Sequence, residues 1–165
     1  EEDRNMEEAL ISGIACNRDE AKITIPRVPD TPGIAHKILG PIAEVNIDVD
    51  MIIQNAGVDG LTDFSFTVPR SDLTRATERL EKKVMDEIGA KTLHTDKNIC
   101  KVSIIGIGMR SSVGVASKMF EVLSKEGINI KMISTSEIKI SVVLEDKYME
   151  LAVRTLHAAF GLSEA

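Results

Sequence analysis

The chain contains an internal repeat, and no other feature of the sequence constrains its fold as strongly. Residues 22–25 (Lys-Ile-Thr-Ile) correspond to residues 101–104 (Lys-Val-Ser-Ile), 79 positions later. Residues 47–52 (Ile-Asp-Val-Asp-Met-Ile) correspond to residues 128–133 (Ile-Asn-Ile-Lys-Met-Ile), 81 positions later. The spacing changes between predicted strands and helices, where loops tolerate insertions. The sequence therefore predicts two copies of one structural unit.

The first copy is predicted to contain a strand, a helix, a hairpin, a second helix and a closing strand. Alternating apolar residues indicate strands, and apolar residues three or four positions apart indicate helices. Pro41 lies inside the first helical pattern and predicts a kink or an early end there. Ser71 and Asp72 are candidates to cap the second helix. The expected elements are a strand at 23–25, a helix through Ile34, Ile38 and Ile42, strands at 45–53 and 63–68, a helix at 73–84 and a weak strand at 91–94.

The second copy repeats this order but lacks its last strand. Gly127 is expected to end its first helix, and Asp146 to cap its second. No strand pattern follows Phe160, and we hypothesise that residues 10–15 supply the closing strand from the N-terminal end. The other expected elements are a strand at 102–107, a loop at 109–112, a helix with Val115, Met119, Phe120 and Leu123 inward, strands at 128–133 and 138–144, and a helix with Met149, Ala152, Val153, Leu156 and Phe160 inward.

This element order predicts an α+β fold with two ferredoxin-like βαββαβ domains in tandem. Each has an antiparallel sheet with its helices on one face. The expected boundaries are an N-terminal segment at 1–19, a first domain at 20–97 and a second domain at 98–165. A unit of about 70 residues has a marginal core, and its sheet has one open face. We therefore expect a homodimer or a larger assembly.

Composition disfavours nucleic acids and membranes as partners. The formal net charge of −6 repels a phosphate backbone, and aromatic residues, at 3%, are too few for base stacking. No apolar run approaches the roughly 18 residues that span a bilayer, and the acidic residues 1–8 do not resemble a signal peptide. Cys16 and Cys100 are interpreted as small apolar residues in a reducing compartment. The sequence predicts a cytoplasmic protein.

Catalytic motifs are not found in the sequence. His36, His94 and His157 lie far apart, and none has the spacing of a metal site. Residues 106–108 (Gly-Ile-Gly) imitate the start of a dinucleotide fingerprint, but Ser111 stands where its third glycine belongs. We therefore predict no catalytic residue, no metal and no cofactor in this chain.

The turn at residues 30–35 (Asp-Thr-Pro-Gly-Ile-Ala) has the features of an amino-acid site. Gly33 lets a ligand approach the backbone closely, and the first amides of the following helix attract a carboxylate. Asp30 can accept an ammonium group. Together these groups complement a free α-amino acid. The alternative is a plain turn in which Asp30 caps the helix.

Several stretches resemble the tandem ACT domains of aspartokinase. They are residues 30–33, residues 52–55 (Ile-Ile-Gln-Asn), residues 129–130 (Asn-Ile) and residues 133–138 (Ile-Ser-Thr-Ser-Glu-Ile). Residues 6–15 resemble the start of the separately translated regulatory β subunit of that family. The resemblance covers nearly the whole chain, and the kinase domain of the family is missing from it. It implies a regulatory part that works with a catalytic subunit or domain, which would use ATP and Mg.

The resemblance further implies feedback inhibition of aspartate phosphorylation in the biosynthesis of lysine, threonine and methionine. In this family, effector sites form where the first ACT domain of one chain meets the second of its partner in a homodimer. Threonine is the first choice of effector and lysine the second. The loop at 109–114 departs from the family pattern because it lacks Asp and Pro. The implied effector-binding residues are Asp30, Thr31, Pro32, Gly33, Ile34, Ala35, Gln54, Asn55, Asn129, Ile130, Thr135, Ser136 and Glu137.

Two other functions remain open on the sequence alone. A module that only assembles a larger enzyme, and binds no ligand, would need the same fold without a ligand-facing carboxylate. A small enzyme on a ferredoxin-like scaffold would need clustered acid, base or nucleophile residues, because the fold alone does not determine function.

Overall fold

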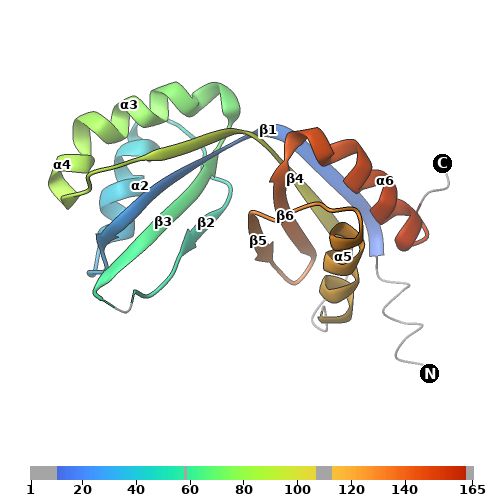
Figure 1. Ribbon diagram of the computed structural model, residues 1–165. Coiled ribbons are helices and arrows are strands. Elements are labelled where there is room, and N and C mark those ends of the chain that lie inside the picture. Colours follow the sequence, from blue (N-terminus) through green and yellow to red (C-terminus); the bar gives the residue numbers. More distant parts are fainter. Residues whose placement is uncertain (1–10, 58, 107–112, 163–165) are drawn as a thin grey trace. The chain divides into compact units, whose positions relative to one another are not determined.

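The computed structural model describes residues 11–57, 59–106 and 113–162. The chain divides into two compact units, which are described separately (Figure 1). The first-repeat unit is Asp19–Lys97, and the second-repeat unit combines the N-terminal segment up to Arg18 with the residues from Asn98 onwards. The hydrogen-bonded strand order is β2-β3-β1-β4-β6-β5. The α+β fold and the two copies of one unit are confirmed.

The first-repeat unit has helices packed on one face of an antiparallel sheet. Its strand β3 pairs with β1 on one side and with β2 on the other, both antiparallel. The elements are β1 (Ile11–Pro29, which begins in the other unit), α2 (Ile34–Glu44), β2 (Ile52–Gln54), β3 (Leu61–Val68), the 3-10 turn η1 (Arg70–Asp72), α3 (Leu73–Lys83), α4 (Met85–Ile88) and the start of β4 (His94–Gly106).

The second-repeat unit uses the remainder of β4 and then repeats the same order. Strand β6 pairs antiparallel with β4 and with β5. The elements after β4 are α5 (Val113–Lys125), β5 (Met132–Thr135), β6 (Lys139–Glu145), the 3-10 turn η3 (Asp146–Tyr148) and α6 (Met149–Ala159). The expected loop at 109–112 lies outside the described residues.

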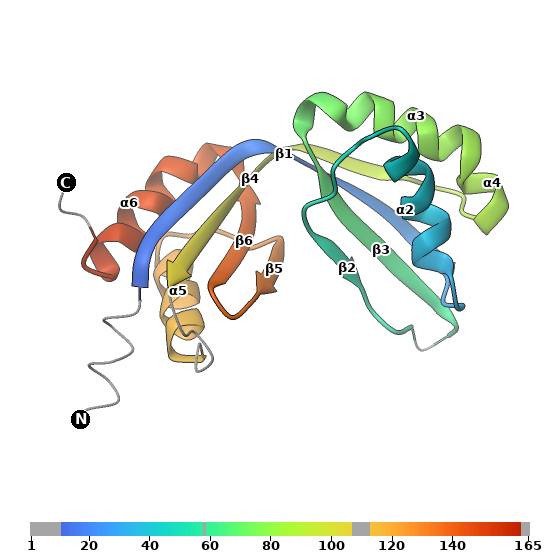
Figure 2. The same cartoon turned by 180° about the vertical axis from the view of Figure 1, so that it is seen from behind.

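Strand β1 supplies its first part to the second-repeat unit. Ser12 donates its hydroxyl to the carbonyl of Ile105 at 3.1 Å, and the side chains of Ile11 and Ile14 pack on the core of that unit. Figure 2 shows β1 and β4 side by side from behind, as Figure 1 does from the front. Strand β4 is likewise one continuous element, so the expected strands at 91–94 and 102–107 were wrong as separate strands.

Each unit encloses its own apolar core between the sheet and the helices. In the first-repeat unit, Phe64 and Phe66 are fully buried, with ring centroids 6.0 Å apart. In the second-repeat unit, Ile140 and Val142 lie at the corresponding positions and are also fully buried. The helix faces predicted from Ile38 and Ile42, and from the second copy's pattern, point into these cores.

Strand register confirms the repeat at the level of single hydrogen bonds. Thr24 on β1 lies opposite Ser65 on β3, and their hydroxyl oxygens are 2.9 Å apart. Ser103 on β4 lies opposite Ser141 on β6, with hydroxyl oxygens 2.7 Å apart. These are the pairs that the sequence repeat aligns.

The first strand of each hairpin begins later in the chain, and is shorter, than the sequence predicted. Asn46, with φ 57°, and Gly127, with φ 69°, both take the left-handed conformation that ends a helix. The residues that follow them, including the buried Ile47 and Ile128, reach the core before the strands begin at Ile52 and Met132. Burial without strand pairing produces an apolar pattern that resembles a strand.

Pro41 does not end its helix. Helix α2 includes Pro41 and continues to Glu44. Ile42, immediately after the proline, is fully buried. The free energy gained by burying the Ile42 side chain offsets the cost of the backbone hydrogen bond that a proline removes from a helix.

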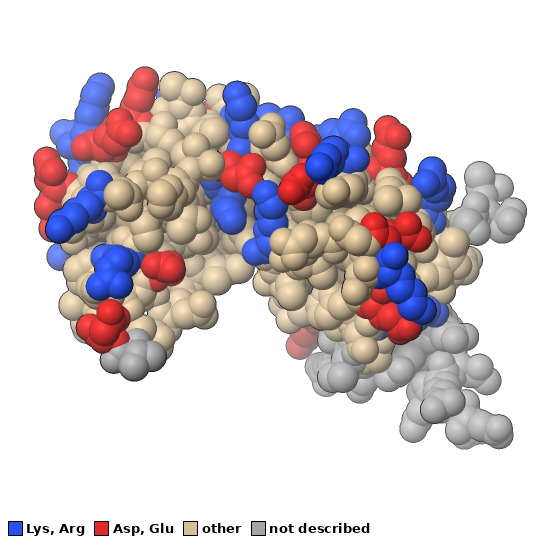
Figure 3. All heavy atoms as spheres, in the orientation of Figure 1, with Lys and Arg blue, Asp and Glu red and all other residues tan. Residues whose placement is uncertain are grey.

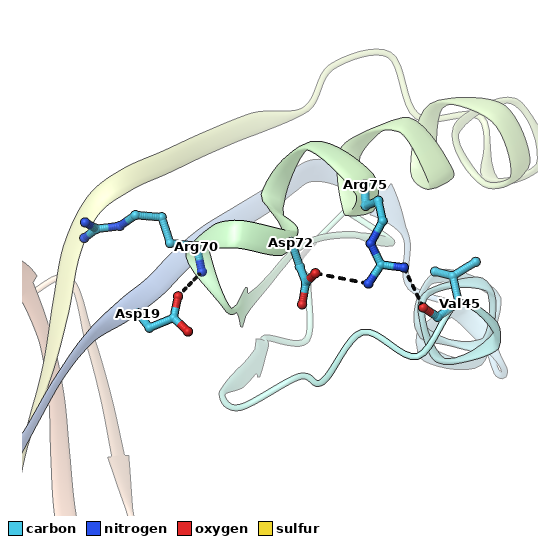
Figure 4. A network of polar contacts seen from close by, with 5 residues as sticks. All are labelled: Asp19, Val45, Arg70, Asp72 and Arg75. Atoms are coloured by element: carbon cyan, nitrogen blue, oxygen red, sulfur yellow. Dashed lines mark hydrogen bonds and ion pairs between the residues drawn. The ribbon is translucent and has the colours of Figure 1, made fainter.

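The predicted side-chain caps are also wrong. Asp72 and Asp146 each lie in a 3-10 turn before the helix, and neither helix has a side-chain cap hydrogen bond. Figure 4 shows that Asp72 instead accepts from Arg75 at 3.0 Å. Arg75 also donates to the carbonyl of Val45 at 2.9 Å and so ties α3 to the end of α2.

Candidate functional site

The turn between β1 and α2 is built around Gly33. Its φ of 87° is left-handed, which glycine adopts without strain. The carbonyl of Thr31 accepts from the amide of Ile34 at 3.2 Å, and the carbonyl of Gly33 accepts from the amide of Lys37 at 3.0 Å. The side chain of Ile34 points into the core, so a ligand at this helix end would meet backbone amides rather than that side chain.

Asp30 is tied to the loop between β2 and β3 through its backbone. Its amide donates to the carbonyl of Gly60 at 2.9 Å. Its exposed carboxylate accepts one long hydrogen bond, 3.4 Å, from the amide of Gly57. Because this bond is long and solvent reaches the carboxylate, the group remains accessible to an ammonium ligand.

Gln54 and Asn55 lie at the end of β2, in the same unit as the turn. Both are exposed, and Gln54 lies opposite Phe64 in the β2–β3 pair. The carbonyl of Asn55 accepts a hydrogen bond from the hydroxyl of Thr62. Asn55 and Gly57 also line a pocket of about 310 Å³ beside this loop. The structure thus places the predicted first-domain residues at one end of the sheet.

Sequence reasoning missed Arg27 in that pocket. Arg27 has a φ of 55° and lies where the β1–β3 register shifts, between Ile25 and Val28. Its amide donates to Asp63 at 2.9 Å, and its guanidinium lies 3.6 Å from the carboxylate of Asp59. The sequence does contain a sign of this bulge. Apolar residues alternate up to Ile25, and the next one is Val28, a break in the alternation that is typical of a β-bulge.

Asn129 and Ile130 lie just before β5 in the second-repeat unit. Together with Gly127 they line a pocket of about 410 Å³ beside the end of α5. Asn129 is exposed and Ile130 is half-buried. The equivalent of Asp30 falls outside the described part of the chain, whereas Gly114, the equivalent of Gly33, lies in α5.

At the opposite end of β5 lie Thr135, its last residue, and Ser136 and Glu137, which are in the exposed turn before β6. The hydroxyl of Ser136 accepts from the amides of Lys139 at 3.2 Å and Ile138 at 3.4 Å, which holds the turn. Four residues of strand, about 13 Å, separate this turn from Asn129. The structure therefore does not bring together the two groups predicted for the second domain.

The described residues contain no candidate metal centre. In residues 11–57, 59–106 and 113–162, no three side chains of His, Cys, Asp or Glu gather as metal ligands would. Cys100 is buried, as suits a small apolar residue, whereas Cys16 is exposed. Figure 3 shows acidic and basic side chains interspersed over the face of each unit that is turned to the viewer. No helix of the described chain is long and apolar enough to cross a membrane.

Both repeats match known protein families. Models described as ACT domain match residues 22–84 and residues 102–160. The aspartokinase of Pseudomonas aeruginosa is 62% identical over 98% of this chain. A solved structure of aspartokinase alpha and beta subunits is 56% identical, with a TM-score of 0.86, over 92% of this chain and 99% of that one. The chain belongs to the aspartokinase family.

Within the aspartokinase family, the chain corresponds to the regulatory ACT-domain part. The regulatory subunit of aspartate kinase from Thermus thermophilus, in a ligand-free form, is 41% identical with a TM-score of 0.86. This chain covers 99% of that subunit. It spans only 39% of the length of the aspartokinase from Pseudomonas aeruginosa, and 38% of the aspartokinase from Helicobacter pylori, which is 48% identical.

Proposed function

We propose that this chain senses a free amino acid and transmits feedback inhibition to an aspartate kinase. The observation that carries this proposal is the exposed carboxylate of Asp30 beside the first turn of α2. The helix N-terminus suits the carboxylate of an amino acid, and Asp30 suits its ammonium group. Threonine is the first choice of effector, because Gln54 and Asn55 suit a small polar side chain. Lysine is the second choice.

The complete site needs two chains. Asp30, Thr31, Pro32, Gly33, Ile34 and Ala35, with Gln54 and Asn55, would come from one chain, and the partner would supply Asn129 and Ile130. Thr135, Ser136 and Glu137 lie at the other end of β5 and are left out of this site. The kinase part, which would use ATP and Mg, would be controlled because effector binding and the arrangement of the ACT domains are thermodynamically linked. An effector that binds one arrangement of the ACT assembly more tightly shifts the population toward it. That arrangement would disfavour aspartate phosphorylation in the cytoplasm.

A second function, assembly without ligand binding, is favoured by one observation. Ile52 on β2 and Ile133 on β5 are equivalent in the repeat, and they are 52% and 44% exposed. Both lie on edge strands, where another chain can add to a sheet. Assembly through these edges does not by itself exclude ligand binding, since a dimer can also create the effector site.

Isothermal titration of the purified chain with threonine, lysine and methionine, singly and in pairs, tests the proposal. We expect saturable heat with threonine. Mass measurement by light scattering on the same sample establishes whether the chain is dimeric. A folded dimer that binds none of the three amino acids would favour the assembly function.

Asp30→Ala should weaken effector binding by about 1.5–3 kcal/mol, the usual worth of a hydrogen bond to a charged group. This corresponds to roughly 10- to 150-fold in affinity. Asp86→Ala, which removes an exposed carboxylate from α4 of the same unit, is the matched control and should bind normally. Equal affinity in wild type and Asp30→Ala would remove Asp30 from the site.

A further inference from the structure

A pocket of about 410 Å³ lies between the first part of β1 and helix α6, entirely within the second-repeat unit. Its volume is within the range of small-molecule pockets, roughly 300–1,000 Å³. It lies outside the residues assigned above to the effector site. Its lining residues are Cys16, Met149, Glu150, Val153, Arg154 and His157.

The floor of this pocket is apolar. Met149 and Val153 are half-buried and pack on the core of the unit. They lie four residues apart on α6, so they share one face of the helix. Cys16 is exposed on β1, with the core-packing Ile14 two residues before it on the same face of the strand. This floor suits a ligand with an apolar body.

The pocket lining has one acidic side chain, Glu150, and one basic side chain, Arg154. Glu150 lies 3.9 Å from Arg18, so its charge is partly offset. Arg154 is exposed, and no carboxylate in the described part of the chain is within ion-pair distance of it. The imidazole of His157, half-buried in the last turn of α6, adds a hydrogen-bond donor. A guanidinium with free donors beside an apolar floor suits a carboxylate.

We propose that this pocket binds a small carboxylate with an apolar body, and that the bound molecule covers the thiol of Cys16. The carboxylate meets Arg154 and His157, and the apolar body lies on Met149 and Val153. The site is independent of the effector site, because it uses one unit of one chain.

Alkylation of Cys16 by iodoacetamide reports whether the pocket is occupied. The thiolate displaces iodide, a thioether forms, and the thiol proton passes to solvent. Cys100 is fully buried and should react only in denaturant, so it serves as an internal control. The probe is 4-phenylbutyrate, a carboxylate with an apolar body, and 4-phenylbutyramide is its neutral counterpart.

We expect 4-phenylbutyrate at saturation to slow the alkylation of Cys16 about tenfold, and the amide to slow it far less. Arg154→Ala should abolish this protection. Lys125→Ala, which removes one positive charge from exposed α5, should leave it intact. Equal protection by acid and amide would contradict recognition of a carboxylate. No protection by either compound, or equal loss of protection in both variants, would overturn the site itself.

Discussion

The two repeats share strand register, helix faces and helix ends, yet they fill these positions with different residues. The first-repeat unit has Phe64 and Phe66 where the second-repeat unit has Ile140 and Val142. All four side chains are fully buried. The same backbone therefore encloses cores of different composition, because hydrophobic burial is not directional.

The repeats differ more strongly in polar contacts. Arg79 on α3 donates to the carbonyl of Pro41 at 3.1 Å and pairs with Glu44 at 2.5 Å, which joins the two helices of the first-repeat unit. Thr155 on α6 holds the equivalent position and donates to the carbonyl of Leu151 in its own helix. Equivalent core positions of the two repeats are thus buried alike, while the polar contacts between their surface elements differ.

The largest expected effect on stability concerns the aromatic core. Phe64→Ala should destabilise the chain by about 3–5 kcal/mol, through lost burial and a cavity. Ile140→Ala should cost less, because a smaller side chain is removed. Urea unfolding followed by circular dichroism measures both, while fluorescence of the single Tyr148 reports the second-repeat unit. An equal or larger loss in Ile140→Ala would contradict the comparison of the cores.

The hydroxyl pairs provide the next comparison. Ser103 and Ser141 are 4% and 3% exposed, whereas Thr24 and Ser65 are half-buried. Ser103→Ala should lower the free energy of unfolding by about 1–3 kcal/mol, because it leaves the buried hydroxyl of Ser141 without its partner. Thr24→Val should cost less, since water can reach Ser65. The double variant Ser103→Ala/Ser141→Ala should recover part of the loss, and a fully additive loss would show that the pairing does not matter.

The bridge between α2 and α3 should contribute less. Arg79→Ala is expected to cost about 1–2 kcal/mol, since the Arg79 side chain is 25% exposed and that of Glu44 is 67% exposed. A double-mutant cycle with Glu44→Ala separates the ion pair from the bond to the Pro41 carbonyl. Thr155→Ala is the matched change in the second-repeat unit. A greater loss from Thr155→Ala than from Arg79→Ala would argue against a structural bridge.

The smallest effect concerns the helix ends. Asn46 holds the left-handed position that Gly127 holds in the other repeat. Asn46→Gly should stabilise the chain by about 0.5 kcal/mol, and Gly127→Asn should destabilise it similarly, because a side chain costs energy at positive φ. Differential scanning calorimetry should register shifts of about 1–2 °C in opposite directions. Shifts of the same sign would show that the two ends are not equivalent.

Much of the candidate site follows from sequence because its signals are local. The turn at 30–33 requires a glycine at positive φ, and the next residues begin a helix, so the exposed Asp30 and the helix end fall side by side. Arg27 was missed because its role depends on the bulge opposite Asp63. Ser136 was predicted from the resemblance. Its hydrogen bonds to the amides of Ile138 and Lys139 depend on the folded turn and could not be predicted from the sequence.

The sequence by itself determined the repeat, the order of elements and the helix faces, because side-chain periodicity records which residues avoid water. The sequence also suggested that residues 10–15 close the second sheet, but only the tertiary structure decided that β1 and β4 each run as one strand through both units. Residues 11–18 pair within the second-repeat unit, far along the chain, and β4 runs from one unit into the other. Periodicity does not record the partner of a backbone hydrogen bond, since any strand can pair with any free edge. Strand sharing therefore depends on which edges the folded cores leave open.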